Sequence, residues 1–151
     1  MGLFSKSVSD DEWLAQVKSL YQESIPIIAA LNELIDKKPL PDDGDKTLQD
    51  AYSKFSLISE SMKRSPNPTS SEARQAKNDL ESAIRNYIKG TKDGLAFYRG
   101  MAGKMGDIYR SGAGLNKLAE ATLGGVLHNF LESTKSAQNN MEKASAYFSA
   151  R

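Results

Sequence analysis

The sequence predicts an all-α fold, an up-and-down four-helix bundle whose last two helices form a long antiparallel hairpin. Apolar residues recur at three- and four-residue spacing through nearly all of the 151 residues, and this spacing places side chains on one face of a helix. No segment has a convincing strand pattern. From residue 84 onward the apolar positions settle into a seven-residue register with two neighbouring rows, which are Ile84, Thr91, Tyr98 and Met105, and Ile88, Leu95, Ala102 and Tyr109.

The first helix is expected to begin near Ser9 and to end at about Lys37. Ser9 and Glu12 have the spacing of a capping box, in which the serine hydroxyl and the glutamate carboxylate satisfy free amides at a helix start. Pro26 lies inside the helical pattern, where a proline removes one backbone hydrogen bond and crowds the preceding turn. The sequence therefore predicts a first helix that is kinked or broken near Pro26.

The second helix is expected over residues 45–63, between two connecting segments. Residues 38–45 and 65–70 each contain two prolines, and a composition rich in proline, glycine and small polar residues is typical of loops. The apolar residues between the two connections follow helical spacing and should be buried; they are Leu48, Ala51, Tyr52, Phe55, Ile58 and Met62.

The third and fourth helices are expected to form the hairpin. Thr69 and Glu72 offer a second capping box, and no proline interrupts the pattern from there to about Arg110, so the third helix would be about 60 Å long. Residues 112–114, Gly-Ala-Gly, fit a tight turn, after which the fourth helix continues to Phe148. Because the turn is so short, these two helices should be antiparallel, and the shorter first pair can cover only part of their length.

Glycine is unusually dense in the third helix, at Gly90, Gly94, Gly100, Gly103 and Gly106. Each interior glycine costs about 1 kcal/mol relative to alanine, so five together cost about 5 kcal/mol, comparable with the lower range of a domain's stability. Three explanations remain open. The glycines allow close packing against neighbouring helices, they form a flexible or broken segment, or they let a ligand approach the backbone.

Composition indicates one globular domain over residues 9–151, preceded by a flexible leader over residues 1–8. The chain has no cysteine, which excludes disulfides, thiolate catalysis and Cys-ligated zinc. Its longest strongly apolar stretch, residues 25–31, is far shorter than the roughly 20 residues that a membrane helix needs. We therefore expect a cytoplasmic protein without a transmembrane segment.

Charge is unevenly divided along the chain, although the net charge is only +1. Residues 1–65 hold 8 Lys and Arg against 11 Asp and Glu (net −3), and residues 66–151 hold 12 against 8 (net +4). Within the basic half, one heptad position opposite the apolar rows is occupied by Arg85, Lys92 and Arg99. A solvated face that balances the acidic first half would explain this row, but the same row could also attract anionic groups.

The leading hypothesis is a non-enzymatic helical interaction or scaffold protein that self-associates as a homo-oligomer and presents helix faces to a protein partner or an anionic surface. Its partner-binding residues would be Arg85, Lys92, Arg99, Phe97 and Tyr109. Nucleic acid is a poor fit, because the pI of about 7.9 lies below the value of about 9 that such domains usually exceed. No cofactor is expected.

Two other hypotheses stay open. A small-molecule-binding bundle or enzyme would have a pocket between the third and fourth helices, near Tyr98, Met105 and His128. A peripheral membrane protein would make a weak contact with anionic lipid through Leu3 and Phe4 of the leader and through the basic heptad position. His128 is the only histidine, and Gly125 stands where a di-metal bundle needs a glutamate, so the sequence predicts neither a metal site nor a catalytic residue.

Overall fold

The computed structural model describes residues 7–37, 40–103, 107 and 117–151, and of residues 117–121 it describes the backbone only. The long elements in these ranges are four helices, α1 (Asp10–Asp36), α2 (Gly44–Lys63), α3 (Ser71–Ala102) and α5 (Lys117–Ser149). Two short strands, β1 (Ser7–Val8) and β2 (Asn67–Pro68), form a parallel pair. The predicted all-α bundle is confirmed.

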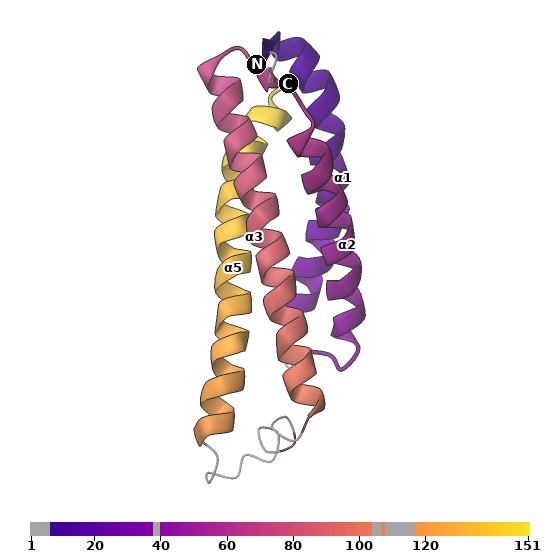
Figure 1. The fold of residues 1–151 in the computed structure, drawn as a ribbon, viewed down its shortest axis with the longest axis vertical. Coiled ribbons are helices and arrows are strands. Elements are labelled where there is room, and N and C mark those ends of the chain that lie inside the picture. Colours follow the sequence, from indigo (N-terminus) through magenta and orange to yellow (C-terminus); the bar gives the residue numbers. More distant parts are fainter. Residues whose placement is uncertain (1–6, 38–39, 104–106, 108–116) are drawn as a thin grey trace.

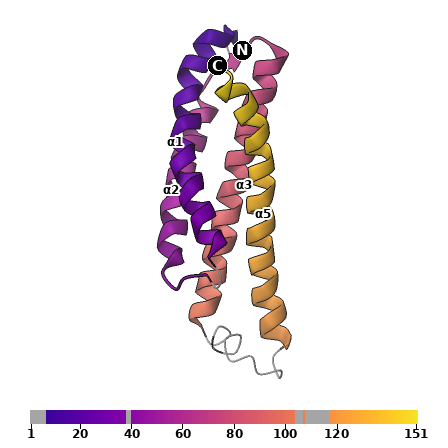
Figure 2. The ribbon, with the colours of Figure 1, turned by 180° about the vertical axis from the view of Figure 1, so that it is seen from behind.

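The helices alternate in direction along the bundle axis, which gives an up-and-down topology (Figures 1 and 2). Each described helix packs against the next in sequence, α3 and α5 make the most extensive contact, and α1 makes only a small contact with α5. Both ends of the described chain lie at the same end of the bundle (Figure 1). At the opposite end α3 and α5 extend beyond α1 and α2, as the predicted long antiparallel hairpin requires.

Helix α1 begins as predicted and continues through Pro26. The Glu12 amide donates a hydrogen bond to Ser9 Oγ at 3.2 Å, which confirms the N-terminal cap. The predicted break is absent, because α1 is one unbroken element from Asp10 to Asp36. Pro26 and Gln22 both lie on the exposed side of α1, so solvent can reach the Gln22 carbonyl that proline leaves without an amide partner.

Helix α3 begins and ends at different residues from those predicted. Its N-cap is Ser70 rather than Thr69, because the Thr69 hydroxyl instead donates to the Val8 carbonyl oxygen at 2.7 Å. It ends at Ala102, eight residues before Arg110, and the amide of the capping Gly103 donates to the Gly100 carbonyl oxygen at 3.2 Å. The predicted turn over residues 112–114 lies outside the described residues.

The N-terminal segment is attached to the connection between α2 and α3. Ser7 pairs with Asn67, and Val8 pairs with Pro68. The Asp10 carboxylate then accepts backbone hydrogen bonds from Thr69 at 3.1 Å and from Ser70 at 3.0 Å. The hydrogen bonds from Ser70 hold the pKa of Asp10 below its ordinary value. The last two residues of the predicted leader are thus paired, while residues 1–6 lie outside the described chain.

Small side chains line the contact between α3 and α5. The buried small residues of α3 include Ala76, Ala83, Gly90 and Gly94, those of α5 include Ser133, Thr134, Ala137 and Ala144, and Gly90 lies against Ser133 and Thr134. A Cβ atom added to Gly90 would lie 3.0 Å from Thr134 Oγ1. At Gly100 an added Cβ would overlap the Leu123 side chain. Close packing therefore explains the described interior glycines of α3, because each of them makes room for a neighbouring helix.

The centre of this contact is offset from the predicted rows of large apolar residues. Ile84 and Thr91 are buried as expected, but Tyr98, Ile88 and Leu95 are only half-buried. Gly90, one position before Thr91 in the heptad, lies against Ser133 and Thr134 of α5. Of the six described members of the predicted rows, only Ile84 and Thr91 are therefore buried, and Ala102 is exposed.

Candidate interaction surface

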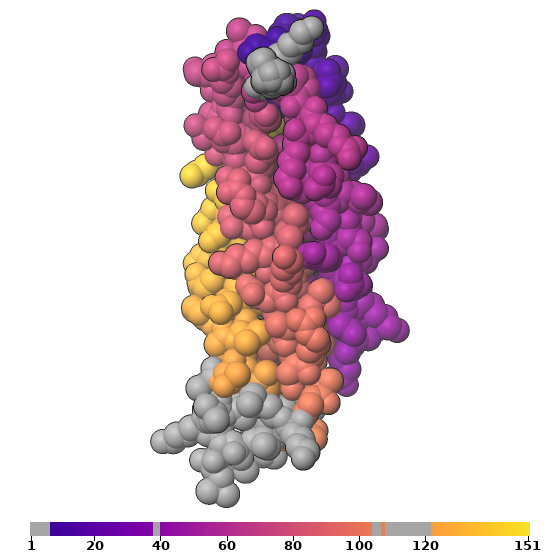
Figure 3. Space-filling view, in the orientation of Figure 1, coloured from indigo at the N-terminus to yellow at the C-terminus, as the bar shows by residue number. Residues whose placement is uncertain are grey.

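Arg85, Lys92 and Arg99 lie on one exposed face of α3, as predicted from their seven-residue spacing. Seven residues are nearly two helical turns, so successive members are about 10.5 Å apart and the row spans about 21 Å. Here we call these three residues the basic row. Figure 3 shows the face of the molecule on which α2 and α3 lie side by side.

The basic row follows the groove between α2 and α3. Arg85 lines a hollow of about 330 Å³ whose apolar wall includes Met62, Ile84 and Ile88. One step along, Lys92 Nζ lies 5.9 Å from the centroid of the Tyr52 ring on α2. Ile88 and Leu95 are half-buried beside the row, so the cations border a partly apolar strip.

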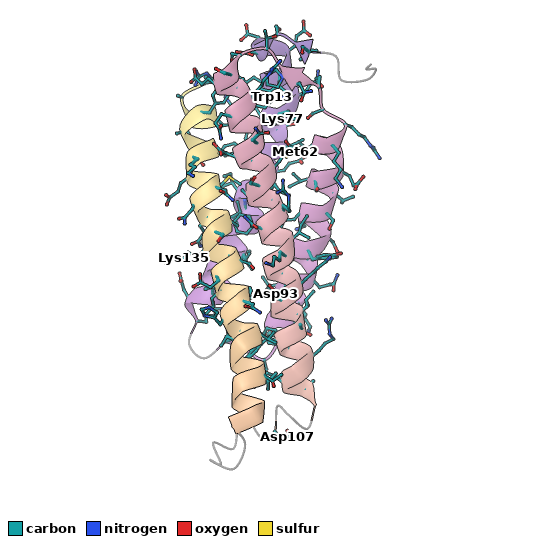
Figure 4. The ribbon with its side chains drawn as sticks, turned by 60° about the vertical axis from the view of Figure 1, so that its left-hand side comes forward. Trp13, Met62, Lys77, Asp93, Asp107 and Lys135 are labelled. Carbon is teal, nitrogen blue, oxygen red and sulfur yellow. The ribbon has the colours of Figure 1, made fainter. Side chains whose placement is uncertain are left out.

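The cations of the basic row are not neutralised within the described part of the chain. Among these residues neither Arg85 nor Arg99 has a carboxylate within ion-pair distance, and the contact of Lys92 with Tyr52 is a cation–π contact. Asp93, the acidic residue next to Lys92, lies on the side of α3 toward α5, where Ser133 Oγ donates to its carboxylate at 3.4 Å (Figure 4). The row therefore keeps charge that an external anionic group can meet.

The groove is not uniformly basic. Glu81 lines the hollow beside Arg85, and Asp42 and Asp45 line a second hollow, of about 390 Å³, beside Arg99. Negative charge thus stands near both ends of the basic row. A ligand of this surface must place its own anionic groups at particular positions along the groove.

Tyr98 holds the connection between α1 and α2 against α3 at the second hollow. Its hydroxyl donates a hydrogen bond to the Pro41 carbonyl oxygen at 2.6 Å. Its ring covers Gly44, the first residue of α2, where an added Cβ atom would overlap the tyrosine hydroxyl. Burial, and after it the nearby carboxylates of Asp45, Asp43 and Asp42, raise the pKa of Tyr98.

Replacing Tyr98 by phenylalanine is expected to lower the free energy of unfolding by about 1 kcal/mol. The substitution removes the donor to Pro41 but keeps the ring that covers Gly44. Chemical denaturation followed by circular dichroism measures the change. A stability equal to that of the unmodified protein would contradict a structural role for this hydrogen bond.

Of the other two residues predicted for partner binding, the structure describes only Phe97. Phe97 is only 6% exposed, lines the second hollow beside Arg99, and its ring meets the Tyr98 ring edge-on at 5.9 Å between centroids. Phe97 therefore offers little exposed area to a partner, and its role in partner binding stays a prediction. Tyr109 lies outside the described residues.

Of the three residues of the alternative pocket, the structure describes Tyr98 and His128. Tyr98 lines the hollow beside Arg99, between α3 and the connection from α1 to α2, rather than a space between α3 and α5. His128 is exposed on α5 and does not line that hollow. Met105 lies outside the described residues. Within the described ranges no group of three or more His, Cys, Asp or Glu side chains is arranged to hold a metal ion.

Part of the groove was not identified from the sequence. The sequence predicts Tyr52 in the core, but it is half-buried and faces Lys92. Ile88, predicted in one of the two apolar rows, is half-buried as well. The spacing of α2 did contain a signal, because Tyr52 and Ser59 are seven residues apart and both lie on the side of α2 that faces α3. Pairing this side of α2 with the basic row required the structure.

These features define a class of protein, an up-and-down four-helix bundle with a basic row along one interhelical groove. No protein-family model matches the chain, and neither a curated protein nor a solved structure matches it significantly. None of the helices within the described ranges combines the length and the apolar character needed to cross a bilayer.

Proposed function

We propose that this protein is a non-enzymatic helical interaction protein that binds an acidic segment of a partner protein in the groove between α2 and α3. The observation that supports the proposal is the basic row itself. Arg85 and Arg99 are exposed without an ion-pair partner among the described residues, and Lys92 has only the Tyr52 ring. Beside them runs the partly apolar strip of Ile88 and Leu95.

The chemistry of the groove favours an acidic amphipathic helix as its ligand. Carboxylates that recur every seven residues on such a helix are about 10.5 Å apart, the same interval as in the basic row. Apolar side chains on the adjoining face of the ligand could then cover Ile88 and Leu95. Charge pairing at the rim would set the register and the rate of association more than the affinity.

A protein segment suits this surface better than an anionic membrane. A lipid surface presents many similar negative charges, and Glu81, Asp42 and Asp45 beside the row would face that charge with the same sign. A peptide can avoid these carboxylates, because its own charges occur at particular positions.

The test uses a fluorescent synthetic peptide of about 20 residues with glutamates at seven-residue intervals and leucines on the adjoining face. A peptide of the same composition in scrambled order is the first control. The variant Arg85→Glu, Lys92→Glu, Arg99→Glu should bind the ordered peptide at least about tenfold more weakly, equivalent to about 1.4 kcal/mol. Fluorescence anisotropy at low and moderate salt measures the affinity, and the helicity of the variant should be unchanged.

A matched variant separates position from total charge. Lys37, Lys135 and Lys143 are exposed basic residues away from the groove, so reversing all three changes the net charge by the same amount. This variant should keep the affinity of the unmodified protein within about twofold. Equal weakening by both variants, or equal binding of the ordered and scrambled peptides, would overturn the proposal. Binding to vesicles with about 30 mol% phosphatidylserine but not to peptide would assign the row to lipid instead.

A further inference from the structure

A second surface lies on the outer side of α1 and α2, away from the basic row. Leu57 on α2 is 70% exposed, the highest exposure among the exposed large hydrophobic residues of the described chain. It stands at the edge of a hollow of about 480 Å³ whose floor includes the buried side chains of Ile27 and Ile58. This hollow is larger than the two along α3. An exposed leucine and an apolar hollow therefore occur side by side on one face.

Opposite charges stand on the two walls of this hollow. Glu23 is on α1 and Lys54 is on α2, and both line it. Glu23 forms no ion pair among the described residues, and Lys54 pairs only with Asp50 on its own helix, at 2.9 Å, with both side chains more than half exposed. An exposed pair of this kind contributes little to stability, so Lys54 can exchange its partner at small cost.

We propose that this face, which we call the Leu57 face, binds a second copy of this chain. In a contact with two-fold symmetry the same surface is used by both copies, so it must complement itself. The shape of the Leu57 face is self-complementary, because each Leu57 can enter the hollow of the other copy. Its charges are self-complementary as well, because the same rotation brings the Glu23 of each copy toward the Lys54 of the other. A partner of uniform charge would satisfy only one of these two residues.

This dimer is independent of the peptide site proposed above. The Leu57 face lies on the outer side of the contact between α1 and α2, whereas the basic row lies beside the groove between α2 and α3. A net charge of only +1 also means that two copies repel one another weakly.

The first experiment is sedimentation velocity of the full chain over about 1 to 200 µM, a range that covers weak and moderate dimers. The unmodified protein should form a dimer, and Leu57→Asp should remain monomeric throughout, a shift of at least about thirtyfold in the dissociation constant. Leu57 is exposed in the monomer, so this variant should keep the helicity of the unmodified protein, and its thermal midpoint should match at concentrations low enough that the unmodified protein is monomeric. The matched control is Leu131→Asp, which changes another exposed leucine, 39% exposed on α5, and should leave the dimer intact.

Charge exchange tests the arrangement independently of the leucine. Glu23→Lys and Lys54→Glu should each weaken dimerisation about tenfold, since each places like charges opposite one another. The double variant restores both pairs and should return to within about threefold of the unmodified protein. A monomer at 200 µM, equal effects of Leu57→Asp and Leu131→Asp, or a double variant weaker than both single variants would each overturn the proposal.

Discussion

Replacing Gly94 by leucine is expected to lower the free energy of unfolding by about 3 kcal/mol or more. Helices α2 and α5 both approach α3 at this residue, and an added Cβ atom alone would lie 2.8 Å from Leu48 Cδ1 and 3.2 Å from Phe130 Cδ1. A complete leucine side chain must therefore displace both neighbours, and inserting atoms into a packed core typically costs 1 to 3 kcal/mol, occasionally more. Urea denaturation followed by circular dichroism measures the loss.

At Gly125 on α5, by contrast, adding a side chain is expected to stabilise the protein. An added Cβ atom there meets nothing within 4 Å, and the residue is exposed. Gly125→Ala should therefore raise the free energy of unfolding by up to about 1 kcal/mol, the difference in helix propensity between the two residues. If Gly94→Leu were also neutral or stabilising, the described contact of three helices at Gly94 would be wrong.

Replacing Tyr87 by phenylalanine is expected to raise the free energy of unfolding by about 1 kcal/mol at neutral pH. The Tyr87 ring is fully buried and stacks on Phe55, with centroids 5.0 Å apart. Its hydroxyl is buried without a hydrogen-bond partner among the described residues, and a buried donor of this kind costs roughly 1 to 3 kcal/mol. Phenylalanine keeps the ring stacking and removes that cost.

The same substitution should change how stability depends on alkaline pH. Burial raises the pKa of Tyr87 from 10.0 to about 12. The unfolded chain therefore ionises first, and stability that is fully present below pH 10 is lost as the pH rises toward 12, by roughly 2 to 3 kcal/mol for two pKa units. Tyr87→Phe has no hydroxyl to ionise at this position, so it should not lose this stability.

Stability measured at several pH values between about 9 and 12 tests this expectation. The advantage of Tyr87→Phe over the unmodified protein should grow by about 2 kcal/mol across the range. The two proteins differ only at residue 87, so the contributions of the other side chains cancel in the difference. An advantage that stayed constant over the range would show that the Tyr87 hydroxyl is not buried in the native state.

Local signals predicted the helices well, since caps and breakers act within a few residues. The Ser9 cap, the end of α2 at Lys63 and the seven-residue spacing of the basic row all follow from neighbours along the chain. The start of α3 did not, because Thr69 and Ser70 both qualify as caps by composition. In the structure the Thr69 amide donates to the Asp10 carboxylate and the Thr69 hydroxyl donates to the Val8 carbonyl oxygen. Both partners lie about sixty residues earlier in the chain.

By itself, the sequence determined that the protein is helical, where most helices begin, and which basic residues share a face, because periodicity is a property of each helix alone. Only the tertiary structure decided which side of α3 forms the contact with α5. Large apolar residues at Tyr98 and Leu95 suggested one side, yet α5 approaches α3 at Gly90, where Ser133 and Thr134 lie against the glycine. How closely two helices pack depends on the volumes of side chains from both, and a small residue becomes the centre of a contact only when its neighbour across the interface fills the space it leaves.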